Sequence, residues 1–347
     1  MKILVLTSSF LAPTYNDKII SQVNYINKFQ GMNAELFNDL PLHIIEEKII
    51  SKKYDCVFPA VVFDKHINGK DYSFNTALYN LLLYHNQDYI GSDVMVQLLM
   101  NDKALTSYRS GIGLPGSIIT KRLWDNSKET ALNTIKEIDY PVIVKPNTLS
   151  ASMGITSDSI AYTNEQISNI VENQFSEYHV LSELWLEKYL DCAQEYTVSV
   201  TGNNSNLLVC PTMLLSKNKN KKFEIYSYNN KRLTSDKRSI DYQVVKDRQT
   251  YSKLVNISIE LFKKFNLRDY CRFDYLMDDN NNLFLIDANT IPALGLNYLY
   301  EYYNNGEIRI EQILALLIIV FAKRKNLLLP EEFLADMPQK LVKILGF

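Results

Sequence analysis

Residues 271–292 read CRFDYLMDDNNNLFLIDANTIP, a stretch with the pattern of a β-hairpin. Two runs, Tyr270–Met277 and Asn282–Asp287, are rich in the aromatic and aliphatic residues that are typical of strands. The polar sequence DDNN between them, at 278–281, is typical of a tight turn. We therefore predict two adjacent antiparallel strands that are joined at this turn.

Four polar side chains of this hairpin are predicted to lie in one patch. Alternate residues of a strand share a face, so Arg272 should lie beside Asp274, and Asp287 beside Asn289. Two carboxylates and an amide oxygen are the hard ligands that suit Mg²⁺, and a guanidinium can stabilise developing negative charge. Solvated charges on a surface hairpin are the simpler alternative. The apolar run Phe284–Ile286 argues against it, because buried carboxylates need partners.

The composition is that of a globular chain with two or three domains. The 347 residues exceed one typical domain. Hydrophobic residues make up 46% and charged residues 22%, which excludes a disordered chain. The formal net charge of -2 gives no field that would attract nucleic acid or an anionic membrane. The 4 cysteines are scattered, which excludes a disulfide scaffold and a cysteine zinc site.

Two apolar segments resemble targeting or membrane signals only in composition. Met1–Phe10 has the texture of a first strand, and no small-residue cleavage site follows it, so we do not expect a signal peptide. Ile313–Ala322 is shorter than the roughly 20 residues that a membrane span requires, so we expect a buried helix there. These observations predict a cytoplasmic protein without a membrane partner.

Strands and helices alternate at the beginning of the chain. Strand-like runs at Lys2–Phe10, Ala34–Asn38 and Cys56–Phe63 are separated by helical periodicity at Ile19–Phe29 and Leu42–Lys52. This alternation predicts a parallel α/β sheet, and its loss after about residue 95 predicts α+β units. The other expected helices are Phe74–Tyr84, Asp93–Arg109, Glu129–Glu137, Asn164–Asn173 and Tyr251–Phe265, and the other expected strands are Ile118–Thr120, Val142–Val144, Val180–Leu186, Glu195–Thr201, Leu207–Leu215 and Phe223–Tyr228.

The sequence GIGLPG at 111–116 matches the dinucleotide-binding pattern GxGxxG but has the wrong context. That fingerprint requires a strand before it and a helix that begins at it. Here a helical segment precedes it, and Pro115 and the strand-like Ile118–Thr120 follow. We interpret it as the end of a helix followed by a turn into a strand.

The order of motifs along the chain resembles that of the ATP-grasp ligases. The hairpin motif, CRFDY at 271–275 followed by LIDANTIP at 285–292, is similar to that of the D-alanine–D-alanine ligase branch of carboxylate–amine ligases. Other motifs of this branch occur upstream in the same order. They are Asp102–Lys103, Tyr140–Pro146, Ser150–Gly154, Leu186–Leu190, Glu195 and Tyr226–Lys231.

The resemblance implies which residues bind the phosphates of ATP. Lys103, Lys145 and Lys231 would neutralise the phosphate oxygens as mobile point charges. The main chain of the loop with Ser150 and Ser152 would cover the phosphates, since small residues permit close approach. Lys231 is therefore also a catalytic candidate.

The resemblance further implies the remaining nucleotide, metal and catalytic residues. Glu187 and Leu190 would meet adenine, mostly through main-chain groups, and Glu195 would accept hydrogen bonds from the ribose. Arg272 would stabilise the oxyanion of the reaction. The cation, Mg²⁺ or Mn²⁺, would be held by Asp274, Asp287 and Asn289.

The regions that bind amino acids in this family match less well. Ala293 stands where the family has a glycine that helps to bind the oxyanion, and it is followed by Leu294 and Gly295. In the first domain, Asp17 is the nearest counterpart of a substrate-binding glutamate. We therefore assign Asp17, Ala293 and Gly295 as candidate substrate residues, and the identity of the acid and the amine stays open.

The resemblance implies an ATP-grasp fold with three domains. Residues 1–95 would form a Rossmann-like parallel α/β domain, 96–185 a central α+β domain, and 186–347 a C-terminal α+β domain with the metal site and a helical tail. The implied activity is ATP-dependent C–N bond formation between a small-molecule carboxylate and an amine, two amino acids or similar compounds. An acyl phosphate is the intermediate, and ADP and phosphate are released.

Two alternatives to this activity remain. One is an ATP-grasp natural-product or L-amino-acid amide ligase with a different substrate pair, and the other is a nucleotide-binding protein without catalytic activity. A homodimer is usual in the family, although nothing in this sequence requires one.

Overall fold

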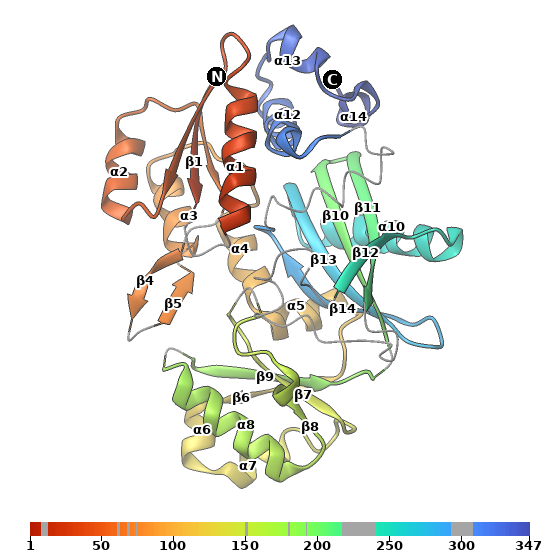
Figure 1. The fold of residues 1–347 in the computed structure, drawn as a ribbon. Helices are drawn as coiled ribbons and strands as arrows, with labels where there is room; N and C mark the ends of the chain where they lie inside the picture. Colours follow the sequence, from red (N-terminus) through yellow and green to blue (C-terminus); the bar gives the residue numbers. More distant parts are fainter. Residues whose placement is uncertain are drawn as a thin grey trace.

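The structure, a computed structural model, describes residues 1–7, 13–60, 63–67, 70–73, 75–149, 152–179, 181–191, 193–216, 240–292 and 308–347. Within these ranges the strands form a three-stranded, a four-stranded and a five-stranded sheet, together with a two-stranded hairpin. The three-stranded and five-stranded sheets lie beside the C-terminal helices (Figure 1). The four-stranded sheet lies below these two sheets in the same view.

The N-terminal sheet is parallel, as the alternation of strands and helices predicts. Its order is β2-β1-β3. Alternate residues of β1 face two different cores: Ile3 and Val5 pack with α1, and Leu4 and Leu6 pack with α2 and α3. The elements are β1 (Lys2–Thr7), α1 (Pro13–Ile26), β2 (Asn33–Asn38), α2 (Leu42–Ile50), β3 (Cys56–Pro59) and α3 (Asn75–Tyr84).

One of the predicted strand ends in this sheet is wrong, because β3 ends at Pro59 rather than at Phe63. The strand β1 is described as far as Thr7, and residues 8–10 of the predicted strand Lys2–Phe10 lie outside the described residues. Phe63 instead begins β4 (Phe63–Ile67), which pairs antiparallel with β5 (Lys70–Ser73) in a hairpin that was not predicted. Apolar character continues across 56–63, so composition alone does not reveal where one strand stops and the next begins.

The four-stranded sheet encloses a core of its own. Its order is β6-β9-β7-β8, and its buried residues, such as Trp124, Val144 and Val171, all lie between 119 and 186. Helices α6 to α8 cover it (Figure 1). The elements are β6 (Gly116–Thr120), α6 (Lys121–Asn126), α7 (Lys128–Asn133), β7 (Val142–Pro146), β8 (Ile160–Ala161), α8 (Asn164–Glu177) and β9 (Glu183–Lys188).

The five-stranded sheet has one face in a hydrophobic core, which includes buried residues of α10. Its order is β12-β11-β10-β13-β14, with antiparallel neighbours. Val198, Phe273 and Leu285 point into the core together with Leu261 of the helix. The elements are β10 (Gln194–Asn203), β11 (Asn206–Ser216), β12 (Ile240–Val244), α10 (Arg248–Lys264), β13 (Asp269–Met277) and β14 (Leu283–Asn289). The predicted strand Phe223–Tyr228 lies outside the described residues.

The predicted helical stretch Asp93–Arg109 is two helices, α4 (Val94–Asn101) and α5 (Lys103–Ser110). Asp102 separates them, because its side chain accepts a hydrogen bond from the Leu105 N–H at 2.8 Å and so caps α5. Both helices contact β14. The domain boundaries at residues 95 and 185 stay a prediction.

The C-terminal helices complete the core of the N-terminal sheet. α12 (Ile313–Lys325) is buried along Ile313–Ala322, as predicted, and packs in one cluster with Ile3 and Phe58. α13 (Glu331–Ala335) and α14 (Gln339–Ile344) add Phe333 and Leu341 to this cluster. In the described part of the chain, no helix is long and apolar enough to cross a membrane.

The GIGLPG sequence has the structure that its context predicts. Gly111 ends α5 with a φ of 77°, in the left-handed region, and Gly116 begins β6. Gly116 also makes room for a tryptophan: a Cβ there would lie 2.3 Å from the ring of Trp185. The segment is a helix end and a turn, and the interpretation against a dinucleotide fingerprint is confirmed.

Candidate active site

The hairpin predicted from residues 271–292 is present at one edge of the five-stranded sheet. β13 pairs antiparallel with β14, and the carboxylate of Asp278 accepts hydrogen bonds from main-chain N–H groups of the turn. Arg272 lies opposite Asn289, and Asp274 lies opposite Asp287. The four predicted residues therefore form two opposed pairs at the end of the hairpin away from its turn. We call them the hairpin patch.

A β-bulge in β14 places Asp287 in this patch. The pairing register shifts between Asp274 and Tyr275, so β14 has one extra residue, Ile286. Without the shift, Asp287 would lie opposite Phe273, whose side chain is fully buried in the core. A bulge re-aims the residues that follow it in this way. The sequence pattern predicts the hairpin but gives no sign of the extra residue.

The carboxylate of Asp274 is held on two sides. Arg272 donates from Nε to Oδ1 at 2.9 Å and from a terminal nitrogen to Oδ2 at 2.6 Å. Thr197 on β10, directly opposite Asp274, donates its hydroxyl to Oδ1 at 2.7 Å. A carboxylate has about four accepting positions, so Oδ2 keeps a lone pair that a cation can take. Sequence reasoning missed Thr197, because only the sheet register brings it to Asp274.

The donor atoms of the hairpin patch fit a hard divalent cation. Asp274 and Asp287 supply carboxylate oxygens, and Asn289 supplies an amide oxygen, which also accepts a hydrogen bond from the Ile291 N–H at 2.9 Å. In the ranges that the structure describes, no group of three or more His, Cys, Asp or Glu side chains is arranged to hold a metal ion. A three-ligand site here therefore needs the amide, and this assignment stays a prediction.

Lys145 on β7 forms a buried ion pair with Glu187 on the adjacent strand β9. The other oxygen of this carboxylate accepts a hydrogen bond from Trp185 Nε1 at 2.7 Å. All three side chains are buried. The side chain of Glu187, a predicted adenine contact, thus holds Lys145 in place, and the role of its main chain stays a prediction. The Trp185 contact was missed, because nothing in the sequence marks a partner two residues before a glutamate.

Lys103 lies next to the chain that leads into the predicted phosphate loop. It is the first residue of α5, and its ammonium donates to the main-chain oxygens of Leu149 and, at 3.4 Å, of Asn147. The buried amide of Asn147 accepts from the Ala104 N–H at 3.0 Å and donates to Glu183 at 3.1 Å. Asn147, which sequence reasoning did not single out, therefore joins the end of β7 to α5. Lys145 on β7 and Lys103 on α5 thus lie on two elements that this hydrogen bond connects.

The described end of the predicted phosphate loop is a tight turn. Ser152 and Gly154 have φ values of 60° and 74°, in the left-handed region. A Cβ at Gly154 would lie 2.7 Å from the side-chain oxygen of Gln174, whose amide nitrogen donates to the Gly154 oxygen. Glycine is thus required where the loop packs against α8.

A small apolar cluster lies beside the hairpin patch on the same face of the sheet. Glu195 lies directly opposite Leu276, two residues beyond Asp274, so these side chains share this face. An apolar surface next to a carboxylate suits the base and the ribose of a nucleoside. The cluster comes from β13, β14 and the segments that lead into and out of the four-stranded sheet: Leu114, Leu190, Ala193, Leu276, Phe284 and Ile286.

The remaining predicted residues are not joined to this arrangement by the described contacts. Asp17 is an exposed residue of α1, and α1 packs against α12. Its role in substrate binding stays a prediction. The other predicted residues lie outside the described part of the chain: Ser150, Lys231, Ala293 and Gly295.

Comparisons with known proteins agree with the motif order. The family model described as "D-ala D-ala ligase C-terminus" matches residues 112–318. A D-alanine–D-alanine ligase of Thermoanaerobacter sp. (strain X514) is 26% identical over 243 residues, which are 69% of this chain and 62% of that protein. The match thus spans less than two thirds of that relative. The D-alanine–D-alanine ligase of Lactococcus lactis subsp. lactis (strain IL1403) is 24% identical over 309 residues, 84% of this chain and 83% of that protein.

Solved structures share the fold at lower identity. The D-alanine–D-alanine ligase from Bacillus anthracis, determined in complex with ATP, has a TM-score of 0.65 and 17% identity, and the match covers 94% of this chain and 99% of that one. A D-Ala:D-Ser ligase from Enterococcus faecalis has a TM-score of 0.64 and 15% identity, with coverage of 92% and 99%.

The three sheets and their order along the chain define a protein of the ATP-grasp class, as the sequence motifs predict. The chain belongs to the D-alanine–D-alanine ligase family, because the model of the family's C-terminal part matches more than half of it.

Proposed function

We propose that this protein is an ATP-dependent ligase that joins the carboxylate of one amino acid to the amine of another. The observation that carries the proposal is the hairpin patch, which sets two carboxylates, an amide oxygen and one guanidinium on a single face of the sheet. The names of the relatives support this reaction and make D-alanine the first substrate to test. Amide ligation of another substrate pair is distinguished by the assay below.

ATP is proposed to bind between the four-stranded and five-stranded sheets. The apolar cluster with Leu190 would receive the base, Glu195 would accept hydrogen bonds from the ribose, and Lys103 and Lys145 would neutralise phosphate oxygens. The solved Bacillus anthracis relative was determined with ATP, which supports this proposal. Ser150, Ser152 and Lys231 are proposed to complete the phosphate site.

The proposed reaction has two steps. An oxygen of the substrate carboxylate attacks the γ-phosphorus, the bond to ADP breaks, and an acyl phosphate forms. The amine of the second substrate then attacks the acyl carbon and the C–N bond forms. The bond to phosphate breaks, and the departing phosphate takes up the proton that the amine loses. Arg272 stabilises the oxyanion of the second step, so the protein acts mainly through positioning and charge neutralisation. Exclusion of water by the phosphate loop protects the acyl phosphate.

The cation is proposed to be Mg²⁺ or Mn²⁺, held by Asp274, Asp287 and Asn289. When bound there, it supplies positive charge to the phosphate oxygens of ATP. Arg272 pairs with the same carboxylate of Asp274, whose remaining lone pair is proposed to bind the cation. Asp17, Ala293 and Gly295 are proposed substrate contacts.

A panel assay tests the proposed function. The full chain is incubated with ATP, Mg²⁺ and either single amino acids or pairs, beginning with D-alanine and including L-amino acids. We expect ADP release that requires an amino acid, and a dipeptide of matching mass. If ADP were released only with pairs of L-amino acids, a natural-product or L-amino-acid amide ligase would be favoured instead. ATP binding without ADP release for any pair would contradict the ligase and favour a nucleotide-binding protein without catalytic activity.

Trp185→Phe is expected to raise the KM for ATP about tenfold. The variant keeps an aromatic ring but removes the N–H that holds Glu187, and a hydrogen bond to a charged group contributes about 1.5–3 kcal/mol. Lys145 would then lose its fixed position. The matched control is Trp124→Phe, in the core on the other face of the same sheet. It is expected to lose stability in thermal unfolding but to keep the KM, and an equal KM in both variants would contradict this role of Trp185.

A further inference from the structure

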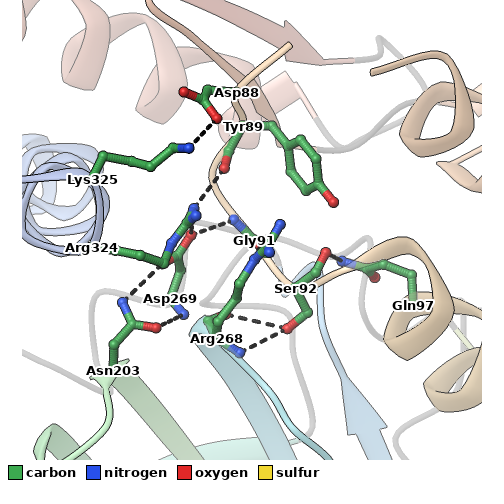
Figure 2. Close-up of polar contacts among 10 residues, drawn as sticks. All are labelled: Asp88, Tyr89, Gly91, Ser92, Gln97, Asn203, Arg268, Asp269, Arg324 and Lys325. Atoms are coloured by element: carbon green, nitrogen blue, oxygen red, sulfur yellow. Dashed lines mark hydrogen bonds and ion pairs between the residues drawn. The ribbon is translucent and has the colours of Figure 1, made fainter. Parts of the chain in front are cut away.

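A polar cluster around the buried Asp269 lies outside the hairpin patch, where the N-terminal sheet meets the five-stranded sheet and α12 (Figure 2). Its residues, which we call the Asp269 cluster, come from segments far apart in the sequence. They are Asp88, Tyr89, Gly91, Ser92, Gln97, Asn203, Arg268, Asp269, Arg324 and Lys325. None of them has a part in the proposed reaction, so their arrangement requires another explanation.

Asp269 is the centre of the cluster and has an unusual main chain. Its φ is 65°, in a region that residues with a Cβ rarely adopt, and the residue is fully buried. Arg324 donates two hydrogen bonds of 2.8 Å to its carboxylate. The Gly91 N–H donates another at 2.8 Å, and the Asn203 amide one at 3.0 Å (Figure 2). Such a conformation persists only where the surroundings hold it, and here four hydrogen bonds do so.

The segment Asp88–Ser92 is fixed from two sides. Tyr89 forms a parallel bridge with Val57 of β3, so the segment continues the N-terminal sheet. From the other side, Arg268 Nε donates to the Gly91 oxygen at 2.7 Å, and the Arg268 N–H donates to the Ser92 hydroxyl at 3.2 Å. The N-terminal sheet and the beginning of β13 therefore have a defined relative position at this segment.

Gln97 on α4 connects this segment with the hairpin patch. Its Nε2 donates to the Ser92 oxygen at 3.3 Å, and its Oε1 accepts from the Thr290 hydroxyl. Thr290 directly follows Asn289. The next residue, Ile291, packs against the core of the N-terminal sheet and donates its N–H to the side-chain oxygen of Asn289 at 2.9 Å. The direction of that oxygen thus depends on two residues that the N-terminal part of the chain holds.

We propose that Gln97 is a positioning residue for the metal site. Through Thr290 it fixes the main chain that aims the amide oxygen of Asn289, and the Asp269 cluster fixes the segment on which Gln97 rests. The inference rests on the proposed function, because it takes Asn289 as a ligand of the cation that accompanies ATP. Groups that do not contact the metal but orient one of its ligands commonly influence the affinity of the site for the metal.

If the hydrogen bond between Gln97 and Thr290 only stabilised the fold, a different result would be expected. Its loss would lower stability and leave the affinity for the cation unchanged. Thr106 offers a matched comparison with Thr290, because both are buried threonines whose hydroxyl is a donor. The Thr106 hydroxyl donates to the Leu99 oxygen at 2.9 Å, within the α4–α5 pair.

The test measures Mn²⁺ binding to the full chain with ATP by electron paramagnetic resonance. The variants are Gln97→Met, Thr290→Val and Thr106→Val. We expect the first two to weaken Mn²⁺ binding about tenfold, as removal of a group behind a metal ligand does. Thr106→Val should bind Mn²⁺ like the wild type, although thermal unfolding should show a similar loss of stability. The affinity for ATP without a cation should be the same in all.

The outcomes separate this inference from the proposed function. Wild-type Mn²⁺ affinity in both Gln97→Met and Thr290→Val overturns the inference while the proposed function stands. An equal loss in Thr106→Val also overturns it, since general destabilisation would then be the cause. A wild-type chain that binds no Mn²⁺ with ATP overturns the proposed function and this inference together. If a single variant does not fold, the double variant Gln97→Met/Thr290→Val replaces it, because neither partner is then left unpaired.

Discussion

Arg272→Ala is expected to slow product formation by about 10²–10³-fold, the usual effect of removing one group that stabilises developing negative charge. The guanidinium lies in the hairpin patch, 2.9 and 2.6 Å from the two carboxylate oxygens of Asp274. ATP binding should change little, because Lys103 and Lys145 lie on other elements. ADP release at steady state measures the first effect, and titration calorimetry with ATP measures the second.

Two further variants complete this experiment. Arg272→Lys keeps a positive charge but cannot form the two-bond contact with Asp274, so an intermediate rate is expected. Arg122→Ala removes an exposed arginine of α6 and should leave the rate unchanged. A wild-type rate in Arg272→Ala would mean that the guanidinium does not act on the reacting atoms, and the role assigned to it would be wrong.

Arg324→Leu is expected to lower the free energy of unfolding by about 3–5 kcal/mol, because it leaves a buried charge without its partner. Asp269 is fully buried, and the guanidinium supplies two of the hydrogen bonds to its carboxylate. The remaining donors, Gly91 and Asn203, are neutral and cannot balance the charge. Chemical denaturation of the wild type and the variant gives the difference directly.

Two neighbouring changes show whether the buried pair is responsible. Lys325→Leu removes the next cation of α12, but its partner Asp88 is partly exposed, so a loss of only about 0–1 kcal/mol is expected. Asp269→Gly removes the buried carboxylate and also relieves the left-handed main chain, so it should cost less than Arg324→Leu. If Arg324→Leu were no more harmful than Lys325→Leu, the stabilising role of the buried pair would be refuted.

Local patterns in the sequence predict the elements of the site but not their exact relation. The hairpin follows from two strand-like runs and a polar turn, and Arg272 and Asp274 follow from alternation along one strand. The single extra residue at Ile286 has no local signature, yet it moves Asp287 from the core face to the site face. Register of this kind depends on packing across the sheet, which composition does not reveal.

Contacts between distant residues are the second part that sequence reasoning does not reach. Asp269 directly precedes the strand Tyr270–Met277 that the sequence predicts. Its partners Gly91 and Arg324 lie 178 and 55 residues away along the chain. Likewise, Lys145 was predicted as a phosphate ligand, whereas its buried pairing with Glu187 follows only from the register of β7 and β9. A motif shows which residues occur, and the fold determines which of them are neighbours.

The core shared by β1 and α12 affects how the chain can fold during its synthesis. Ile3 and Leu345 belong to one hydrophobic cluster, although almost the whole sequence separates them. β1 and α1 therefore leave the ribosome long before α12, α13 and α14, which complete the core around Ile3 and Val5, exist. Contacts of such long range form slowly, and an uncovered apolar strand is prone to aggregation. The core around β1 thus stays incomplete until α12 has been made.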